Sequence, residues 1–129
     1  AAGPNKLEKP MQVLIVESRS DLGSLWARHL ERMGMDVTLC DNQTCAIQYL
    51  ATHDVDMILL DLVLSEGGAL AVADYANYRH PDARVIFVTS SSFFSDGSIF
   101  AHAANACAFV PAATPPDDLA ALLEHYAQV

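Results

Sequence analysis

Two acidic residues of this 129-residue chain stand directly after runs of apolar residues. Glu17 follows the apolar residues 13–16, and Asp61 follows the apolar residues 57–60. If both runs are parallel strands of one sheet, their carboxyl ends meet at the same edge, and the two carboxylates lie together. Paired carboxylates either share a proton or hold a divalent cation, and oxygen ligands favour Mg²⁺ over softer metals. We therefore expect an acidic site at this edge.

Two other polar side chains have positions from which they can act on the same site. Thr89 follows the apolar residues 85–88, and its hydroxyl can donate to an anion between the strand ends. Arg19 lies in the loop after the first apolar run. It can either turn toward Asp61 or remain a solvated loop arginine, which is the commoner state of this residue type at a surface.

The elements that must position these residues follow from hydrophobic periodicity. Short apolar runs lie at residues 13–16, 37–40, 57–60, 85–88 and 106–110. Helical patterns lie between and after them, at residues 22–33, 46–50, 70–79, 99–103 and 119–126. This alternation predicts an α/β fold, a doubly wound five-stranded parallel sheet of the flavodoxin-like order 2-1-3-4-5 with five helices. The second run contains Thr38 and is expected at the edge of the sheet.

Composition limits the classes of protein. With 52% hydrophobic and 18% charged residues, the chain is expected to fold as one domain over residues 11–129. Residues 1–10 have no apolar period and are predicted to be a linker or a cloning remnant. The apolar stretches are shorter than the roughly 20 residues that cross a bilayer, so no membrane association is expected. The net charge of −9 argues against nucleic acid as a partner.

The cysteines suggest a compartment. Cys40, Cys45 and Cys107 are odd in number and show no CxxC spacing. This pattern favours reduced, buried thiols and a cytoplasmic location.

From residue 12 to residue 126 the chain resembles the CheY-like receiver domain of two-component response regulators. The segments that carry the resemblance are VLIVES, DMILLDL, HPDARVIFVTS and PDDLAALL. The resemblance implies a cytoplasmic signalling domain of a phosphorelay and not an enzyme. It also implies a histidine kinase or phosphotransfer protein as partner, with an output domain in a longer chain or a homodimer as further possibilities.

The resemblance also implies roles for individual residues. Asp61 corresponds to the phosphoacceptor, and Thr89 and Phe109 correspond to the switch hydroxyl and the switch aromatic. Glu17, Asp61 and the backbone carbonyl of Val63 correspond to ligands of Mg²⁺. Phosphoryl transfer needs mainly positioning and charge neutralisation, which these groups would supply.

The chain departs from the family pattern at two charged positions, which makes it an atypical or degenerate member. Ser18 stands where the family has its second metal-binding acid, and Ala112 stands where it has a lysine. Lys6 and Lys9, in the segment before the fold, are the lysines of this chain. We therefore expect Mg²⁺ binding to be weak or absent and phosphotransfer to Asp61 to be impaired or altered.

Two other functions stay open at this point. The domain can be a pseudo-receiver that acts, without phosphorylation, as a protein-interaction or dimerisation module, and Phe93 and Phe94 form either a binding patch or core packing. More remotely, it can be a small flavodoxin-like enzyme or cofactor binder. Against that function, residues 17–20 lack the glycines of a phosphate-binding loop, and Val63 replaces the acid that haloacid-dehalogenase-type phosphatases need.

Overall fold

The computed structural model describes residues 10–89 and 105–127. Its strands are β1 (Gln12–Val16), β2 (Asp36–Cys40), β3 (Met57–Asp61), β4 (Arg84–Thr89) and β5 (Ala106–Pro111). Its helices are α1 (Ser20–Arg32), α2 (Gln43–Thr52), α3 (Ala69–Arg79) and α4 (Pro116–Ala127). Each of the five predicted apolar runs therefore forms a strand.

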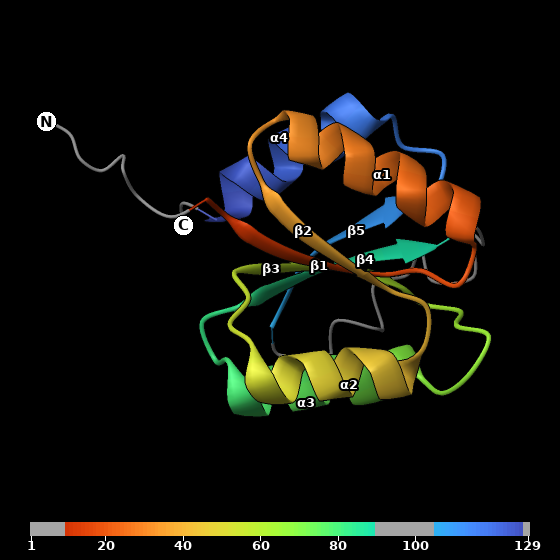
Figure 1. Cartoon of the computed structure of the whole chain (residues 1–129), viewed down its shortest axis with the longest axis vertical. Helices are drawn as coiled ribbons and strands as arrows, with labels where there is room; N and C mark the ends of the chain where they lie inside the picture. The colour runs from red at the N-terminus through yellow and green to blue at the C-terminus, as the bar shows by residue number, and fades with distance from the viewer. Residues whose placement is uncertain (1–9, 90–104, 128–129) are drawn as a thin grey trace, which may run out of the picture.

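The strands form one parallel sheet in the order β2-β1-β3-β4-β5, which confirms the predicted fold class and order. Helices α1 and α4 cover one face of this sheet, and α2 and α3 cover the other (Figure 1). The described residues contain four of the five predicted helices. The fifth, at residues 99–103, lies outside the described residues, as do Phe93 and Phe94.

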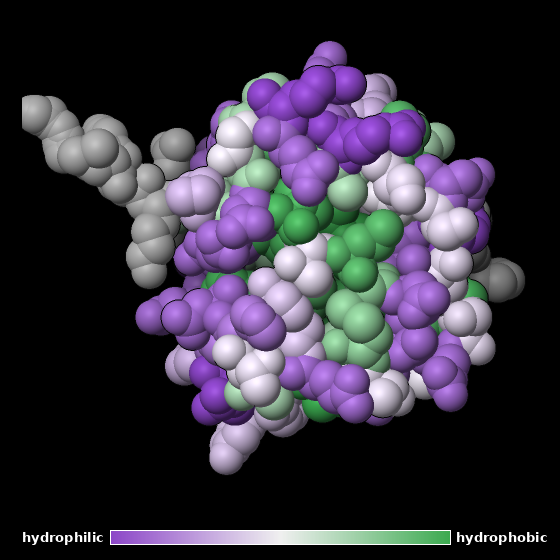
Figure 2. Space-filling model, in the orientation of Figure 1, coloured by the Kyte–Doolittle hydropathy of each residue, from purple (hydrophilic) through white to green (hydrophobic). Residues whose placement is uncertain are grey.

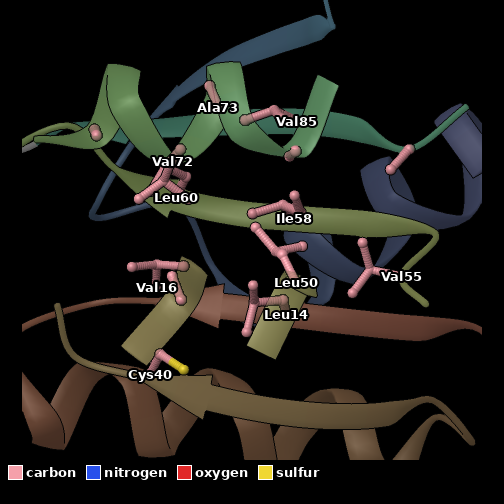
Figure 3. Close-up of a cluster of buried hydrophobic side chains, with 14 of the residues drawn as sticks. Leu14, Val16, Cys40, Leu50, Val55, Ile58, Leu60, Val72, Ala73 and Val85 are labelled. Carbon is pink, nitrogen blue, oxygen red and sulfur yellow. The ribbon is translucent and has the colours of Figure 1, made fainter. Parts of the chain in front are cut away.

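Hydrophobic clusters on both faces explain why the central strands are continuously apolar. On the α2–α3 face, Leu14 and Val16 of β1 pack with Ile58 and Leu60 of β3 (Figure 3). On the opposite face, the alternate residues of the same strands pack against α1 and α4; this cluster includes Ile15, Leu59, Trp26, Leu30, Leu119 and Leu123. Because side chains pack against these strands on both faces of the sheet, the carboxyl ends of the strands are fixed in register.

Strand β2 forms an edge of the sheet, as its composition predicts. Its side chains are mostly exposed or half-buried, and 37% of Leu39 is exposed. Figure 2 shows hydrophobic side chains gathered at the centre of the face on which β2 lies. In the described part of the chain, none of the helices has the length and hydrophobicity needed to span a bilayer.

The cysteines differ from the prediction. Cys40, which ends β2, and Cys45, in the first turn of α2, are joined in a disulfide. The expectation of three reduced thiols is therefore wrong for these two residues. The tight turn between β2 and α2 places their Cα atoms 5.6 Å apart, within the range that a disulfide spans. Sequence spacing alone does not reveal this approach. Cys107 is half-buried and unpaired with another cysteine.

The pairing predicts the number of reactive thiols. Protein isolated without reductant and then unfolded should take up one equivalent of iodoacetamide, at Cys107, and three after reduction. Intact-mass spectrometry measures both numbers. In the variant Cys45→Ser, the unreduced protein should take up two equivalents, because Cys40 loses its partner. Three equivalents in the unreduced wild type would show that Cys40 and Cys45 are thiols.

Candidate functional site

Glu17 and Asp61 stand at the same level at the carboxyl edge of the sheet. Val16 of β1 pairs with Leu60 of β3, and Glu17 and Asp61 are the residues that follow this pair. Both are almost fully buried, with 1% of Glu17 and 3% of Asp61 exposed. Two buried carboxylates so close together disfavour each other's charge unless a cation and hydrogen bonds compensate.

The guanidinium of Arg19 bridges the two carboxylates. Its Nε donates to Oε2 of Glu17 at 3.2 Å, and its Nη2 donates to Oδ2 of Asp61 at 3.3 Å. The Arg19 backbone N–H also donates to Oε2 of Glu17, at 2.9 Å, and the Val63 N–H donates to Oδ1 of Asp61 at 2.9 Å. Nη2 of Arg19 lies 3.5 Å from the remaining Glu17 oxygen. All four carboxylate oxygens therefore have a donor.

The electrostatics of this cluster follow from burial and proximity. Burial raises the pKa of Glu17, and the neighbouring Asp61 carboxyl acts in the same direction, whereas the Arg19 N–H groups oppose both effects. The hydrogen bond to Glu17 in turn raises the pKa of Arg19, so the guanidinium is charged at any physiological pH. The site thus holds a permanent cation in contact with Asp61.

The hydroxyl of Ser18 connects its own loop to two others. Its hydroxyl donates to the carbonyl of Asp41 at 2.7 Å, in the β2–α2 loop. The same oxygen accepts the backbone N–H of Ser65 at 2.7 Å, in the β3–α3 loop. A carboxylate cannot donate to the Asp41 carbonyl, so serine suits this position as a structural tie.

Gln43 of α2 ties the far end of the same β3–α3 loop. Its side-chain oxygen accepts the N–H of Gly68 at 2.7 Å, and its backbone N–H donates to the carbonyl of Glu66 at 3.2 Å. Between them, Gly67 adopts a φ of +87°, which is strained for any other residue type, and a Cβ at this position would collide with the Gln43 side chain. The loop after Asp61 is thus held at both ends.

The other predicted site residues lie at or near this edge. Asp61 pairs with Val88, so Thr89, which is buried, stands one residue further along the neighbouring strand. The Ala112 N–H donates to the Thr89 carbonyl at 2.7 Å, which brings Ala112 to the same edge. Phe109 is partly buried, and its ring lies 6.4 Å from that of Phe87. The structure fixes these positions, whereas the functional roles stay predictions.

The residues present do not fit a bound Mg²⁺. Both carboxylates that would hold the ion are paired with Arg19, and the Ser18 hydroxyl is used between two loops. Within residues 10–89 and 105–127, no group of three or more acidic, histidine or cysteine side chains is placed to hold a metal. Mg²⁺ gives up its water ligands reluctantly and needs carboxylates that are available to it.

Sequence reasoning underestimated Arg19 and missed the roles of Ser18 and Gln43. Arg19 was expected more as a solvated loop residue than as a partner of Asp61. The signal that favours the pairing is the lack of lysine in the fold, which leaves two buried acids without their usual cation. The contacts of Ser18 and Gln43 depend on three loops meeting in space, so no local pattern reports them.

The Ser18 tie predicts a loss of stability on substitution. Ser18→Ala removes two hydrogen bonds in a partly exposed place, so the free energy of unfolding should fall by about 1 kcal/mol. Ser18→Asp should destabilise more, because its carboxylate would face the Asp41 carbonyl. Urea unfolding monitored by circular dichroism measures both values. Ser18→Thr keeps the hydroxyl and is the control. A Ser18→Asp variant as stable as the wild type would contradict this role.

Burial of Glu17 predicts a pH-dependent stability. Because the pKa is raised in the folded state, ionised Glu17 opposes folding as the pH rises from the unfolded value of 4.5 through the folded value. The stability of the wild type relative to Glu17→Gln should therefore be lower at about pH 8 than at about pH 4. Urea unfolding at both pH values measures the difference. Glu31→Gln, on the exposed side of α1, controls for the lost charge. The prediction is wrong if the free energy of unfolding of the wild type relative to Glu17→Gln is the same at both pH values.

Comparisons with known proteins agree with this architecture. The response regulator protein PilR of Pseudomonas aeruginosa is 33% identical over 113 residues, which cover 88% of this chain and 24% of PilR. The chain therefore spans about a quarter of the length of that relative. A CheY-like receiver domain protein from Methanospirillum hungatei has the same fold, with a TM-score of 0.85, 18% identity, and coverage of 92% of this chain and 94% of that one.

A further solved structure shows the fold in a different chemical state. A response regulator protein from Burkholderia pseudomallei, solved with a phosphorylated aspartic acid, a calcium ion and citrate, has a TM-score of 0.80 and 21% identity. The likeness covers 92% of this chain and 69% of that one. The family model described as "Response regulator receiver domain" matches residues 13–124, and this chain belongs to that family, the receiver domains of two-component signal transduction.

Proposed function

We propose that this receiver domain accepts a phosphoryl group on Asp61 from a phosphohistidine of a kinase or phosphotransfer protein. We expect the transfer to be slower than in a receiver domain that has the second acid and the lysine of the family pattern. The observation that supports the proposal is the environment of Asp61. Its carboxylate ends β3 beside Glu17 and accepts hydrogen bonds from both the Arg19 guanidinium and the Val63 N–H. These donors orient a nucleophilic oxygen and offset charge near the incoming phosphoryl group.

Besides the phosphohistidine and Asp61, the reaction needs only a proton from water. An Asp61 carboxylate oxygen attacks phosphorus, the new P–O bond forms, and the P–N bond to the donor imidazole breaks. The electron pair of the broken bond stays on the imidazole nitrogen, which takes a proton from water. Asp61 is modified once per transfer, so the domain is a recipient and not a catalyst with turnover.

The rate follows from the missing charges. Ser18 and Ala112 replace an acid and a lysine of the family pattern. Removing one transition-state electrostatic contact typically costs about 3 kcal/mol in an enzyme site. Because Arg19 supplies one positive charge, we expect impaired transfer and not its complete loss.

The phosphorylated state would be transmitted by the predicted switch pair. Thr89 lies one residue beyond the strand partner of Asp61, and Phe109 packs beside Phe87 on the neighbouring strand. A new anion on Asp61 draws hydroxyl donors toward itself, and the space left beside β4 favours a different position of the partly buried Phe109. In the same proposal, an output domain in a longer chain or a second copy of this chain reads the change, and the domain works in the cytoplasm. In that compartment the Cys40–Cys45 disulfide would be an exception, because disulfides are rare there.

A second function is favoured by one observation. The Asp61 side chain is only 4% exposed and already paired with a cation, so the unmodified site is electrostatically satisfied. A pseudo-receiver that binds partners without phosphorylation would have such a site. Membership of a signalling family gives no support to the flavodoxin-like enzyme or cofactor binder.

Mass spectrometry after treatment with a small phosphodonor separates these functions. Incubation with phosphoramidate should add the mass of one phosphoryl group slowly, and Asp61→Asn should abolish the addition, because the amide lacks the nucleophilic oxygen. Asp82→Asn, an exposed aspartate at the opposite edge of the sheet, is the matched control and should label like the wild type. Labelling that survives in Asp61→Asn would show a different acceptor, and lack of labelling in the wild type would favour the pseudo-receiver.

A further inference from the structure

Arg19 is distinguished from the other arginines by its place in the fold. The chain has five arginines. Arg28 and Arg32 lie on the middle and last turns of α1, Arg79 ends α3, and Arg84 begins β4 at the amino edge of the sheet. Among the described residues, Arg19 is therefore the basic side chain in contact with the predicted phosphoacceptor.

The contacts of Arg19 are those of a bridging cation. Nε and Nη2 bond the carboxylates of Glu17 and Asp61, which come from two different strands. A guanidinium carries five N–H donors in one plane, and the bonds to described residues engage Nε and Nη2, so Nη1 remains for another anion. The side chain is 46% exposed, which leaves one side of this cation open to an incoming group.

We propose that Arg19 is the resident cation of the site, and that it takes the place of the divalent cation that the family pattern implies. It neutralises the carboxylates of Glu17 and Asp61 in the resting domain and would pair with phosphoryl oxygens during transfer. Arginine suits this role because its planar donors bind carboxylate and phosphate groups in the same geometry.

The same contacts explain why a metal is not needed. A divalent cation between Glu17 and Asp61 would have to displace the guanidinium, which is tethered one residue beyond Glu17 and held by its own backbone bond to that carboxylate. The Ser18 hydroxyl, in the position of the missing acid, bonds two other loops. The site consequently offers Mg²⁺ no uncommitted carboxylate.

Metal binding tests this inference without reference to phosphorylation. Isothermal titration calorimetry should show no Mg²⁺ binding to the wild type at millimolar concentration. Arg19→Ala should bind Mg²⁺, because Glu17 and Asp61 lose their cation. Arg28→Ala, on the exposed face of α1, removes the same charge outside the site and should behave like the wild type. Thermal unfolding of each variant verifies that it is folded, and Arg19→Gln, which removes the charge but keeps a polar side chain of similar length, replaces Arg19→Ala if that variant unfolds.

Labelling by phosphoramidate tests whether Arg19 pairs with phosphoryl oxygens during transfer, and this part of the inference rests on the proposed function. The wild type should label equally with EDTA and with Mg²⁺. Arg19→Ala should label about a hundredfold more slowly in EDTA, as expected for the loss of one transition-state donor, and Mg²⁺ should restore part of the rate. Arg28→Ala should again match the wild type.

The two proposals fail in different ways. If the wild type binds Mg²⁺ as well as Arg19→Ala does, or labels only when Mg²⁺ is present, Arg19 is not the resident cation, although Asp61 can still be the acceptor. If no variant labels but only Arg19→Ala binds Mg²⁺, Arg19 is the resident cation and the proposed phosphorylation is wrong. Arg19→Lys keeps the charge and should retain labelling in EDTA. Loss of labelling in this variant would count against a role based on charge.

Discussion

Two carboxylates buried side by side require a compensating charge. The backbone around the carboxyl edge of the sheet holds these two carboxylates in place. The Glu17 N–H donates to the Cys40 carbonyl at 3.0 Å, and the Leu62 N–H donates to the Val88 carbonyl at 2.9 Å. These bonds extend the strand ladders beyond the last paired residues, so the backbone on either side of the site is rigid. A rigid backbone cannot separate the carboxylates, and only a cation or a proton relieves their repulsion.

The alternation of side chains in β1 and β3 decides which face the site uses. Val16 and Leu60 point into the α2–α3 cluster, whereas Ile15 and Leu59 point into the α1–α4 cluster. By the same period of two, residues 17 and 61 turn toward the face on which α1 begins. Helix α1 can approach closely because it carries Gly23, where a Cβ would stand 2.8 Å from Leu39 and 3.5 Å from the Cβ of Glu17. The loop between β1 and α1 is therefore short and delivers Arg19 to the carboxylates.

The sequence was sufficient to predict the parts of the fold that depend on one segment at a time. Continuous apolar runs predicted central strands such as β3, all of whose residues are buried, and Thr38 marked β2 as an edge. The carboxyl-edge placement of Glu17 and Asp61 followed from the predicted strand order. The Cys40–Cys45 disulfide, the Ser18 tie and the direction of the Arg19 side chain could not be predicted in this way. Each depends on the relative position of two or three loops, and loop geometry is not encoded in periodicity.

One of the two departures from the family pattern, the replacement of an acid by Ser18, forms a coherent change together with Arg19 when the charges at the metal position are compared. Three carboxylates around a divalent cation leave one net negative charge, and two carboxylates around a guanidinium leave the same. Replacing an acid by Ser18 and placing Arg19 next to it thus preserves the charge at the metal position and exchanges a diffusible ion for a covalently attached one. The positive charge that is lost at Ala112 is not replaced by this exchange. An attached cation needs no binding equilibrium, so on the proposed function the state of Asp61 would depend on the phosphodonor and not on the concentration of Mg²⁺. The exchange has a cost, because a guanidinium meets phosphoryl oxygens through hydrogen bonds and lacks the charge density of a divalent metal. On the proposed function, a slow and metal-independent receiver would be the physical consequence of that exchange.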